Sequence, residues 1–580
     1  MSRINILLSF SLCIFSISCV YGQSKVTETI FEKNEGLQTA TYNETIDYYR
    51  ALSKSYPTVN IQEIGETDSG LPLHMVTFNT DKDFDFRKIH NNKAIVLINN
   101  GIHPGEPDGI DATMMLMRDF ASGKLKAPKN IIIIAIPVYN IGGALNRNSS
   151  SRANQNGPEA YGFRGNARNY DLNRDFIKSD TKNALAFAEI FHLLNPDVFI
   201  DNHVSNGADY QYTLTHLFTQ HNKLGNEAGH YLNKTLQPLL EKKLSEENHD
   251  ITPYVNVFNR PPDDGFSQFM DSPRYSTGYT ALFNTFGLMV ETHMLKPYKD
   301  RVEGTYALMK HMIAITDENY QDIKTIRKDA YKAYSPRSEY PISWEIDSSK
   351  VTTLQFKGYE SEYRTSKVSG KDRLFYDRDK PFTKPVKYYN HFKPSATVTI
   401  PTAYAIPQGW WNVIHLLKAN AIEMRKLKND TIIRAEIYRI EDFKTRSAPY
   451  EGHYQHYNTT FSKTTEDVTL KKGDYLVYTA QPGVKYLLET LEPHAVDSFF
   501  NWNFFDSILQ QKEGFSPYVF EEIAYEILNN NPGLKREFEN KKNEDEAFRE
   551  NGYMQLDWIY KNSEYYEKAH KRYPVFRVLN

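Results

Sequence analysis

The residues best suited to chemistry in this sequence are His103 and Glu106, in the run Gly-Ile-His-Pro-Gly-Glu-Pro-Asp-Gly. An imidazole and a carboxylate three residues apart in a turn rich in Gly and Pro can bind one metal ion together. The turn follows the apolar run 94–98, which predicts a buried strand, and open α/β sheets place their sites at the carboxyl ends of such strands. Because an H-x-x-E arises by chance on the order of once in a chain of this length, the pair needs partners elsewhere.

A third ligand is expected at another strand end, since a catalytic zinc ion takes three protein ligands and leaves one position for water. Asp201-Asn202-His203 directly follows the apolar run 198–200, which predicts a second buried strand. A lone histidine after a strand is more often a structural residue. His203 is a candidate ligand because it follows a predicted buried strand of the same kind as the one before His103. We expect His103, Glu106 and His203 to form the metal site.

Four motifs follow one another in chain order: H-P-G-E at 103–106, D-L-N-R at 171–174, D-x-H at 201–203 and V-E-T-H at 290–293. With Ile64-Gly65 near the start, residues 30–325 resemble the zinc metallocarboxypeptidase family of the carboxypeptidase A type. The resemblance implies a hydrolase, a metalloprotease that removes a C-terminal residue with one Zn2+ per chain.

The resemblance also implies a role for each matching residue. His103, Glu106 and His203 would bind zinc, and Asp171 would accept a hydrogen bond from a ligand histidine. Glu291 would be the general base, taking a proton from water and passing it to the leaving amine.

Further residues would hold the substrate. Asn173 and Arg174 would bind its terminal carboxylate, for which a guanidinium fork is suited. An arginine should also stabilise the oxyanion. Arg164 fits best, because it lies nine residues before Asn173 in an R-x-N-A pattern, although Arg152 and Arg168 remain candidates.

The family also uses a mobile tyrosine before the catalytic glutamate. Tyr275 and Tyr279 both qualify, and we favour Tyr279 because it follows a glycine. This tyrosine lies closer to Glu291 than in digestive carboxypeptidases, and Asn140-Ile-Gly-Gly143 replaces the usual N-P-D-G turn. Both departures affect the specificity pocket, so the side-chain preference is not predicted.

The composition sets the broad class of the protein. The chain has 580 residues, of which 40% are hydrophobic, so two or three domains are expected. The net charge of −3 gives no electrostatic reason to expect a nucleic acid or an anionic membrane as partner. The oligomeric state is not predicted.

The first residues resemble a secretory signal peptide. Arg3 supplies a positive charge, residues 6–17 are largely apolar, and small residues precede a cleavage site before Gln23. We therefore expect residues 1–22 to be removed and the protein to be secreted or periplasmic, with a lipid anchor on Cys19 as the weaker alternative. Both cysteines lie in this leader, so the mature chain would contain no disulfide.

Apolar runs alternate with helical patterns through the first half of the chain. This alternation predicts an α/β fold with a mixed, largely parallel sheet and helices on both faces, over residues 28–328. Short segments rich in Thr, Tyr and Val predict a β-rich, sandwich-like domain over 335–480. Residues 481–580 are expected to be mainly helical.

Other functions compete with a carboxypeptidase. A zinc amidase or deacylase, or a hydrolase of peptidoglycan stem peptides, would share the zinc site. An inactive relative that binds peptide or glycan could use aromatic residues such as Trp410-Trp411. Glu291 distinguishes an active enzyme from an inactive relative, because an inactive relative would usually have lost the base or a metal ligand.

Overall fold

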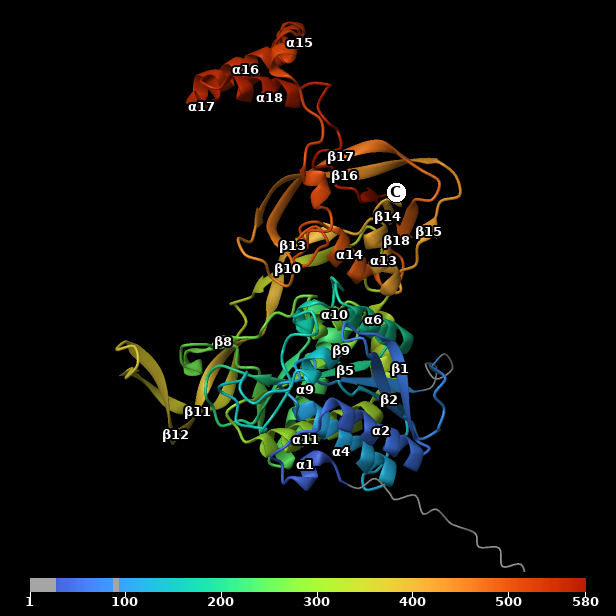
Figure 1. Cartoon of the computed structure of the whole chain (residues 1–580), viewed down its shortest axis with the longest axis vertical. Helices are drawn as coiled ribbons and strands as arrows, with labels where there is room; N and C mark the ends of the chain where they lie inside the picture. The colour runs from blue at the N-terminus through green and yellow to red at the C-terminus, as the bar shows by residue number, and fades with distance from the viewer. Residues whose placement is uncertain (1–27, 87–92, 580) are drawn as a thin grey trace, which may run out of the picture.

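The computed structural model describes residues 28–86 and 93–579 (Figure 1). The predicted signal peptide lies outside the described residues. Among the residues that are described, no helix is long and apolar enough to cross a membrane.

An eight-stranded sheet forms the centre of the first half of the chain, with the order β1-β2-β4-β3-β5-β9-β6-β7. Neighbouring strands are parallel in the pairs β3/β4, β3/β5, β5/β9 and β6/β7 and antiparallel in the other pairs. The strands are β1 (Val59–Glu66), β2 (Pro72–Phe78), β3 (Ala94–Asn99), β4 (Ile131–Ile136), β5 (Val198–Ser205), β6 (Leu214–Phe218), β7 (Ile251–Pro253) and β9 (Phe286–His293).

The central strands are buried on both faces, as expected for parallel strands covered by helices. In β3, Val96 and Ile98 pack into one core, whereas Ile95 and Leu97 pack into the other. Helices α2 (Tyr42–Ser55), α4 (Asp108–Ser122), α9 (Gln237–Glu246) and α11 (Tyr298–Glu318) contribute to the first core, and α6 (Lys182–Leu194) and α10 (Ser276–Ala281) to the second. The predicted fold class, a mixed sheet with helices on both faces, is confirmed.

Short helices complete this half of the chain. They are α1 (Ile30–Lys33), α5 (Ile141–Leu145), α7 (His221–Leu224), α8 (Asn226–Tyr231) and α12 (Tyr320–Ala330).

Three smaller sheets follow. A two-stranded sheet pairs β10 (Glu339–Ile346) with β13 (Phe392–Thr399), and a three-stranded sheet has the order β11 (Thr352–Thr365), β12 (Asp372–Tyr389), β8 (Phe266–Ser267). The six-stranded sheet has the order β15 (Arg425–Lys426), β18 (Tyr475–Tyr478), β14 (Ala403–Ile406), β19 (Phe576–Val578), β16 (Thr431–Thr445), β17 (His456–Leu470). We call this sheet, with α13 (Trp411–Ala419) and α14 (Val484–Leu491), the downstream module.

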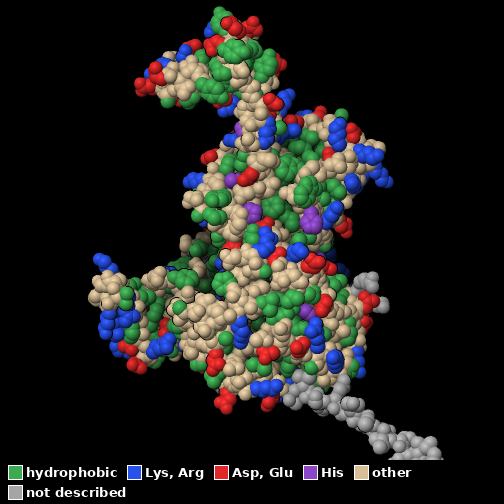
Figure 2. Space-filling model, in the orientation of Figure 1, with side chains coloured by type: hydrophobic (Ala, Val, Ile, Leu, Met, Phe, Trp, Pro, Cys, Tyr) green, Lys and Arg blue, Asp and Glu red, His purple; other side chains and the backbone are tan. Residues whose placement is uncertain are grey.

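The downstream module and the eight-stranded sheet share one core. Ile95 and Leu97 of β3 belong to the same buried apolar cluster as Tyr404 of β14 and Leu487 of α14. Helices α15 (Pro517–Asn530), α16 (Pro532–Glu544), α17 (Glu546–Arg549) and α18 (Gly552–Lys561) form a separate cluster at one end of the molecule (Figure 1). Charges of both signs are spread over the face seen in Figure 2.

The expected domain boundaries stay predictions. Three strand pairings cross them: β12 of the predicted β-rich segment pairs with β8, and β19 of the predicted helical segment pairs with both β14 and β16.

Candidate active site

His103, Glu106 and His203 come together at the carboxyl ends of two neighbouring strands. The first two lie in the turn between β3 and α4, and His203 lies in β5. Since β3 and β5 are parallel, with Asn99 opposite Asp201, the turn and His203 reach the same edge of the sheet. One ligand atom from each of the three residues lies within 4.8 Å of the others, and the three residues are only 2–3% exposed.

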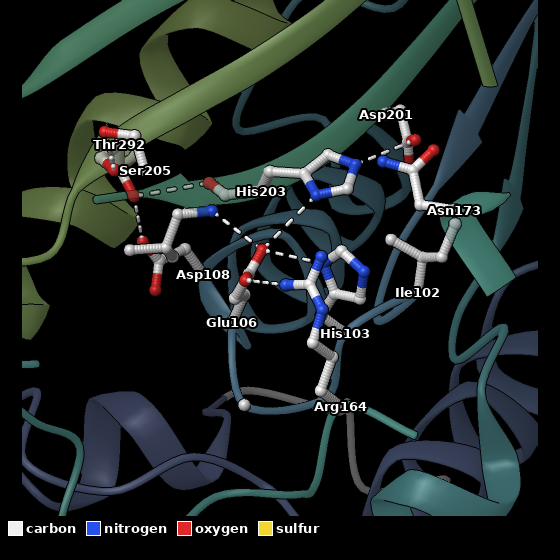
Figure 3. A network of polar contacts seen from close by, with 12 residues as sticks. Ile102, His103, Glu106, Asp108, Arg164, Asn173, Asp201, His203, Ser205 and Thr292 are labelled. Carbon is white, nitrogen blue, oxygen red and sulfur yellow. Dashed lines mark hydrogen bonds and ion pairs between the residues drawn. The ribbon is translucent and has the colours of Figure 1, made fainter. Parts of the chain in front are cut away.

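Both histidines are oriented by carboxylates behind them. His103 Nε2 lies 2.9 Å from Asp171 Oδ1, and His203 Nε2 lies 2.9 Å from Asp201 Oδ2. The two Nδ1 atoms each lie 3.3 Å from Glu106 Oε2 (Figure 3). If each Nε2 carries the proton that these carboxylates accept, both Nδ1 lone pairs face Glu106, which is the tautomer that a metal site requires.

Glu106 is held in its ionised form. Its Oε1 accepts a hydrogen bond from Arg152 Nη1 at 2.8 Å, and its Oε2 accepts one from the backbone N–H of Val204 at 3.0 Å. Although burial acts to raise its pKa, the charge of Arg152 and the contacts with His103 and His203 hold the pKa of Glu106 well below its usual range. Two imidazoles and one carboxylate, each fixed by a second partner, are a donor set that fits zinc.

The three residues open onto a cavity of about 520 Å³. It is also lined by four residues that the sequence analysis favoured for catalysis or substrate binding: Arg164, Asn173, Arg174 and Glu291. Its wall also includes Arg152, Asn154, Asn206, Leu217, Tyr254, Asn256, Phe258, Phe269, Tyr275, Met289 and Met294.

Glu291 lies in β9 directly opposite His203 of β5 and faces the cavity. Burial raises the pKa of Glu291 to about 8; the neighbouring carboxylate of Glu106 adds to the shift, and His203 and Arg164 oppose it. A cation bound nearby would lower this pKa, because it stabilises the ionised form.

Arg164, expected to stabilise the oxyanion, and Arg174, expected to bind the terminal carboxylate, are fixed in different ways. Arg164 is half exposed and contacts Asp171 Oδ2 through Nε at 3.0 Å and Nη2 at 2.8 Å. Arg174 donates from Nη1 to the carbonyl oxygen of Asn173 at 2.8 Å, and its guanidinium lies 4.5 Å from the centre of the Tyr275 ring.

Tyr279, the tyrosine favoured from the sequence, lies apart from the cavity. Its side chain is fully buried, and its hydroxyl contacts Asn420 Oδ1 at 2.5 Å and His192 Nε2 at 3.1 Å, outside the cavity. The reason is its place on α10: Tyr275 precedes the helix at the cavity, whereas Tyr279 lies one turn later on the face that packs into the core. Tyr275, the alternative, lines the cavity.

Some residues at the site were missed or not assigned. Asp201 could have been found from its spacing, because residues two apart in a strand share a face, which places Asp201 beside His203. Arg152 was expected only as a candidate for the oxyanion, whereas it pairs with Glu106. Tyr254 lies in a loop and has no motif that would single it out.

Comparisons with known proteins point to the family that the motifs resemble. Residues 45–195 match the family model described as zinc carboxypeptidase. Carboxypeptidase 2 of Trichophyton rubrum is 22% identical over 496 residues, covering 80% of this chain and 84% of that protein, and carboxypeptidase 2 of Trichophyton equinum is 21% identical over 491 residues, with the same coverage.

Among solved structures, a metallo-carboxypeptidase from Burkholderia cenocepacia matches with 17% identity and a TM-score of 0.36, over 50% of this chain and 70% of that one. Carboxypeptidase A from Helicoverpa armigera matches with 14% identity and a TM-score of 0.36, over 49% of this chain and 74% of that one. The family model and the curated relatives agree with the resemblance seen in the motifs: residues 45–195 match the model of a zinc carboxypeptidase domain, and the curated relatives are named carboxypeptidases.

Proposed function

We propose that this protein is a secreted zinc carboxypeptidase that hydrolyses the peptide bond next to a free C-terminal carboxylate. The observation that carries the proposal is the content of one cavity. His103, Glu106 and His203 lie in it together with the carboxylate Glu291 and the cation Arg174. A hydrolytic centre and a group that binds carboxylates therefore face the same space.

The proposed metal ligands are His103, Glu106 and His203. When bound by them, zinc supplies a Lewis acid that polarises the scissile carbonyl and activates water. Glu291 faces the same cavity and can take a proton from water and deliver it to the leaving amine.

Arg164 is the best supported group for stabilising the oxyanion. Arg152 already donates to Glu106 at 2.8 Å and to Gln155 at 2.5 Å. Arg168 donates to the carbonyl oxygen of Asp180 and is not among the residues that line the cavity. Arg164 lines the cavity and is anchored by Asp171, so its guanidinium can face the developing negative charge.

Asn173 and Arg174 are the proposed carboxylate clamp. Asn173 Oδ1 accepts a hydrogen bond from the backbone N–H of Ser276 at 3.2 Å, and its amide nitrogen has no hydrogen bond to any residue that the structure describes, so it can donate to a substrate. Arg174 stacks on Tyr275, which keeps the guanidinium extended along the cavity wall. Tyr275 replaces Tyr279 as the proposed aromatic contact for substrate.

The test is digestion of a peptide library, read by mass spectrometry. We expect loss of single C-terminal residues, inhibition by a chelator and recovery with zinc. Arg174→Ala should slow cleavage of free-carboxylate peptides far more than cleavage of their C-terminal amides. Equal losses on both substrates would instead favour an amidase or an endopeptidase.

The substrate class, the location and the catalytic competence of the protein can each be tested separately. A stem peptide of peptidoglycan also ends in a carboxylate, so the same clamp would suit it. The leader-like residues 1–22 support secretion or a periplasmic location, which N-terminal sequencing of the exported protein would test by finding Gln23 first. The presence of Glu291 at the cavity argues against an inactive relative. The side chain of Trp411 is 73% exposed and could still contact a peptide or glycan at the surface.

A further inference from the structure

One loop of the downstream module reaches the wall of the catalytic cavity. It connects β16 with β17 and comprises residues 446–455; we call it the 446–455 loop. Three of its side chains bond to the segment that carries D-L-N-R. Arg174 Nε donates to the Tyr450 hydroxyl at 2.9 Å, the backbone N–H of Asp171 donates to Glu451 Oε2 at 2.8 Å, and His453 Nε2 lies 2.7 Å from Asp180 Oδ2.

The contact with Arg174 completes the fixation of that side chain. Its Nη1 donates to the Asn173 carbonyl, its plane lies over Tyr275, and its Nε is bound by Tyr450. No hydrogen bond of Nη2 is found among the described residues. Because Nε and Nη1 are already bound inside the protein, the guanidinium cannot rotate freely, and Nη2 is left for a carboxylate.

The 446–455 loop is held in place by contacts of its own. The backbones of Tyr450 and His453 bond to each other in both directions, at 2.8 and 3.1 Å. Gly452, with φ of +79°, packs so closely on Tyr170 that a Cβ would lie 2.4 Å from the Tyr170 hydroxyl. The Tyr450 ring is stacked on Trp502 at 6.1 Å with an interplanar angle of 17°.

We propose that Tyr450 is a positioning residue for substrate binding and that the downstream module thereby completes the carboxylate clamp. The inference rests on the proposed function of Arg174. Tyr450 does not line the cavity, so it acts through Arg174 and not by touching substrate. The loop supplies this contact from 276 positions further along the chain.

Tyr450→Phe tests the proposal in the full-length zinc-loaded protein, because it removes the hydroxyl and keeps the ring that stacks on Trp502. With free-carboxylate peptides, we expect KM to rise about three- to tenfold, the effect of loosening one hydrogen bond to a charged group, with kcat nearly unchanged. Zinc content and melting temperature should stay at wild-type values. Tyr454→Phe is the matched control, because Tyr454 lies in the same loop and is 53% exposed.

A double-mutant cycle with Arg174→Lys separates positioning from a general structural effect. Lysine keeps the positive charge but lacks the Nε–H that Tyr450 accepts. Tyr450→Phe should therefore add no further rise in KM when combined with Arg174→Lys. Additive rises, or a wild-type KM in Tyr450→Phe, would overturn the role of Tyr450 while leaving the proposed function intact. Failure of the wild-type protein to cleave free-carboxylate peptides would overturn the proposed function and this inference with it.

Discussion

Replacing Glu291 with glutamine should change two properties of the protein that can be measured separately: the pH dependence of its free energy of unfolding and its catalytic activity. The carboxyl has a pKa raised to about 8 by burial, against 4.5 for an ordinary glutamate. The folded protein therefore holds the proton more tightly than the unfolded chain does. The stability that this contributes is fully present below about pH 4.5 and is lost as the pH rises towards 8.

The magnitude follows from the size of the shift. One pKa unit corresponds to about 1.4 kcal/mol, so the full shift corresponds to a loss of about 5 kcal/mol between these pH values. Because Glu291 faces a cavity open to water, we expect a loss of about 2–4 kcal/mol. Glutamine cannot ionise, so Glu291→Gln should be free of this loss.

The assay is urea unfolding of chelator-treated protein at pH 5 and pH 8. The two proteins should have similar free energies of unfolding at pH 5, and Glu291→Gln should be the more stable at pH 8. Glu303→Gln, at an exposed position of α11, is the control. The same stability difference at both pH values would refute the reasoning. When zinc is restored, Glu291→Gln should bind the metal and fail to turn over substrate, so an active variant would remove its role as base.

Three further outcomes are expected. Asp201→Asn should lower zinc affinity about 10- to 100-fold in competition with a coloured chelator, because Asp201 orients His203; unchanged affinity would contradict that. Arg301→Met should destabilise the protein by about 3–5 kcal/mol in urea, because it leaves Asp108 buried without the cation that lies 3.1 Å away; a loss below about 1 kcal/mol would count against this. Elemental analysis of purified protein should find about one zinc per chain, and none in His103→Ala/His203→Ala, whereas equal metal in both would place the ion elsewhere.

The sequence is most informative where a residue that can bind a metal directly follows a predicted buried strand. Apolar runs before His103 and His203 predict two strands, and parallel pairing of those strands then brings the two histidines to one edge. Strand β6, which pairs antiparallel with β9, is not predicted in this way, because an apolar run carries no information on the direction of its neighbour.

The aromatic residue of the site was harder to choose. Tyr275 and Tyr279 lie one helical turn apart in a segment that is almost wholly buried, so hydrophobic periodicity could not tell which one faces the cavity. The role of Tyr450 could not be predicted from the sequence for another reason. Its partner Arg174 lies 276 positions earlier in the chain, and no local sequence pattern indicates a contact between residues so far apart.

The place of β19 within the six-stranded sheet has a consequence for biosynthesis. β19 lies between β14 and β16, yet it follows β17 by roughly 100 residues in the chain. At synthesis rates of about 5–20 residues per second, the two halves of that sheet wait on the order of 5–20 s for the strand that joins them. The 446–455 loop is carried between β16 and β17, so we expect it to settle against Arg174 after β19 has joined their sheet. The proposed substrate clamp would then form late in the production of the protein, after the proposed metal ligands have been synthesised.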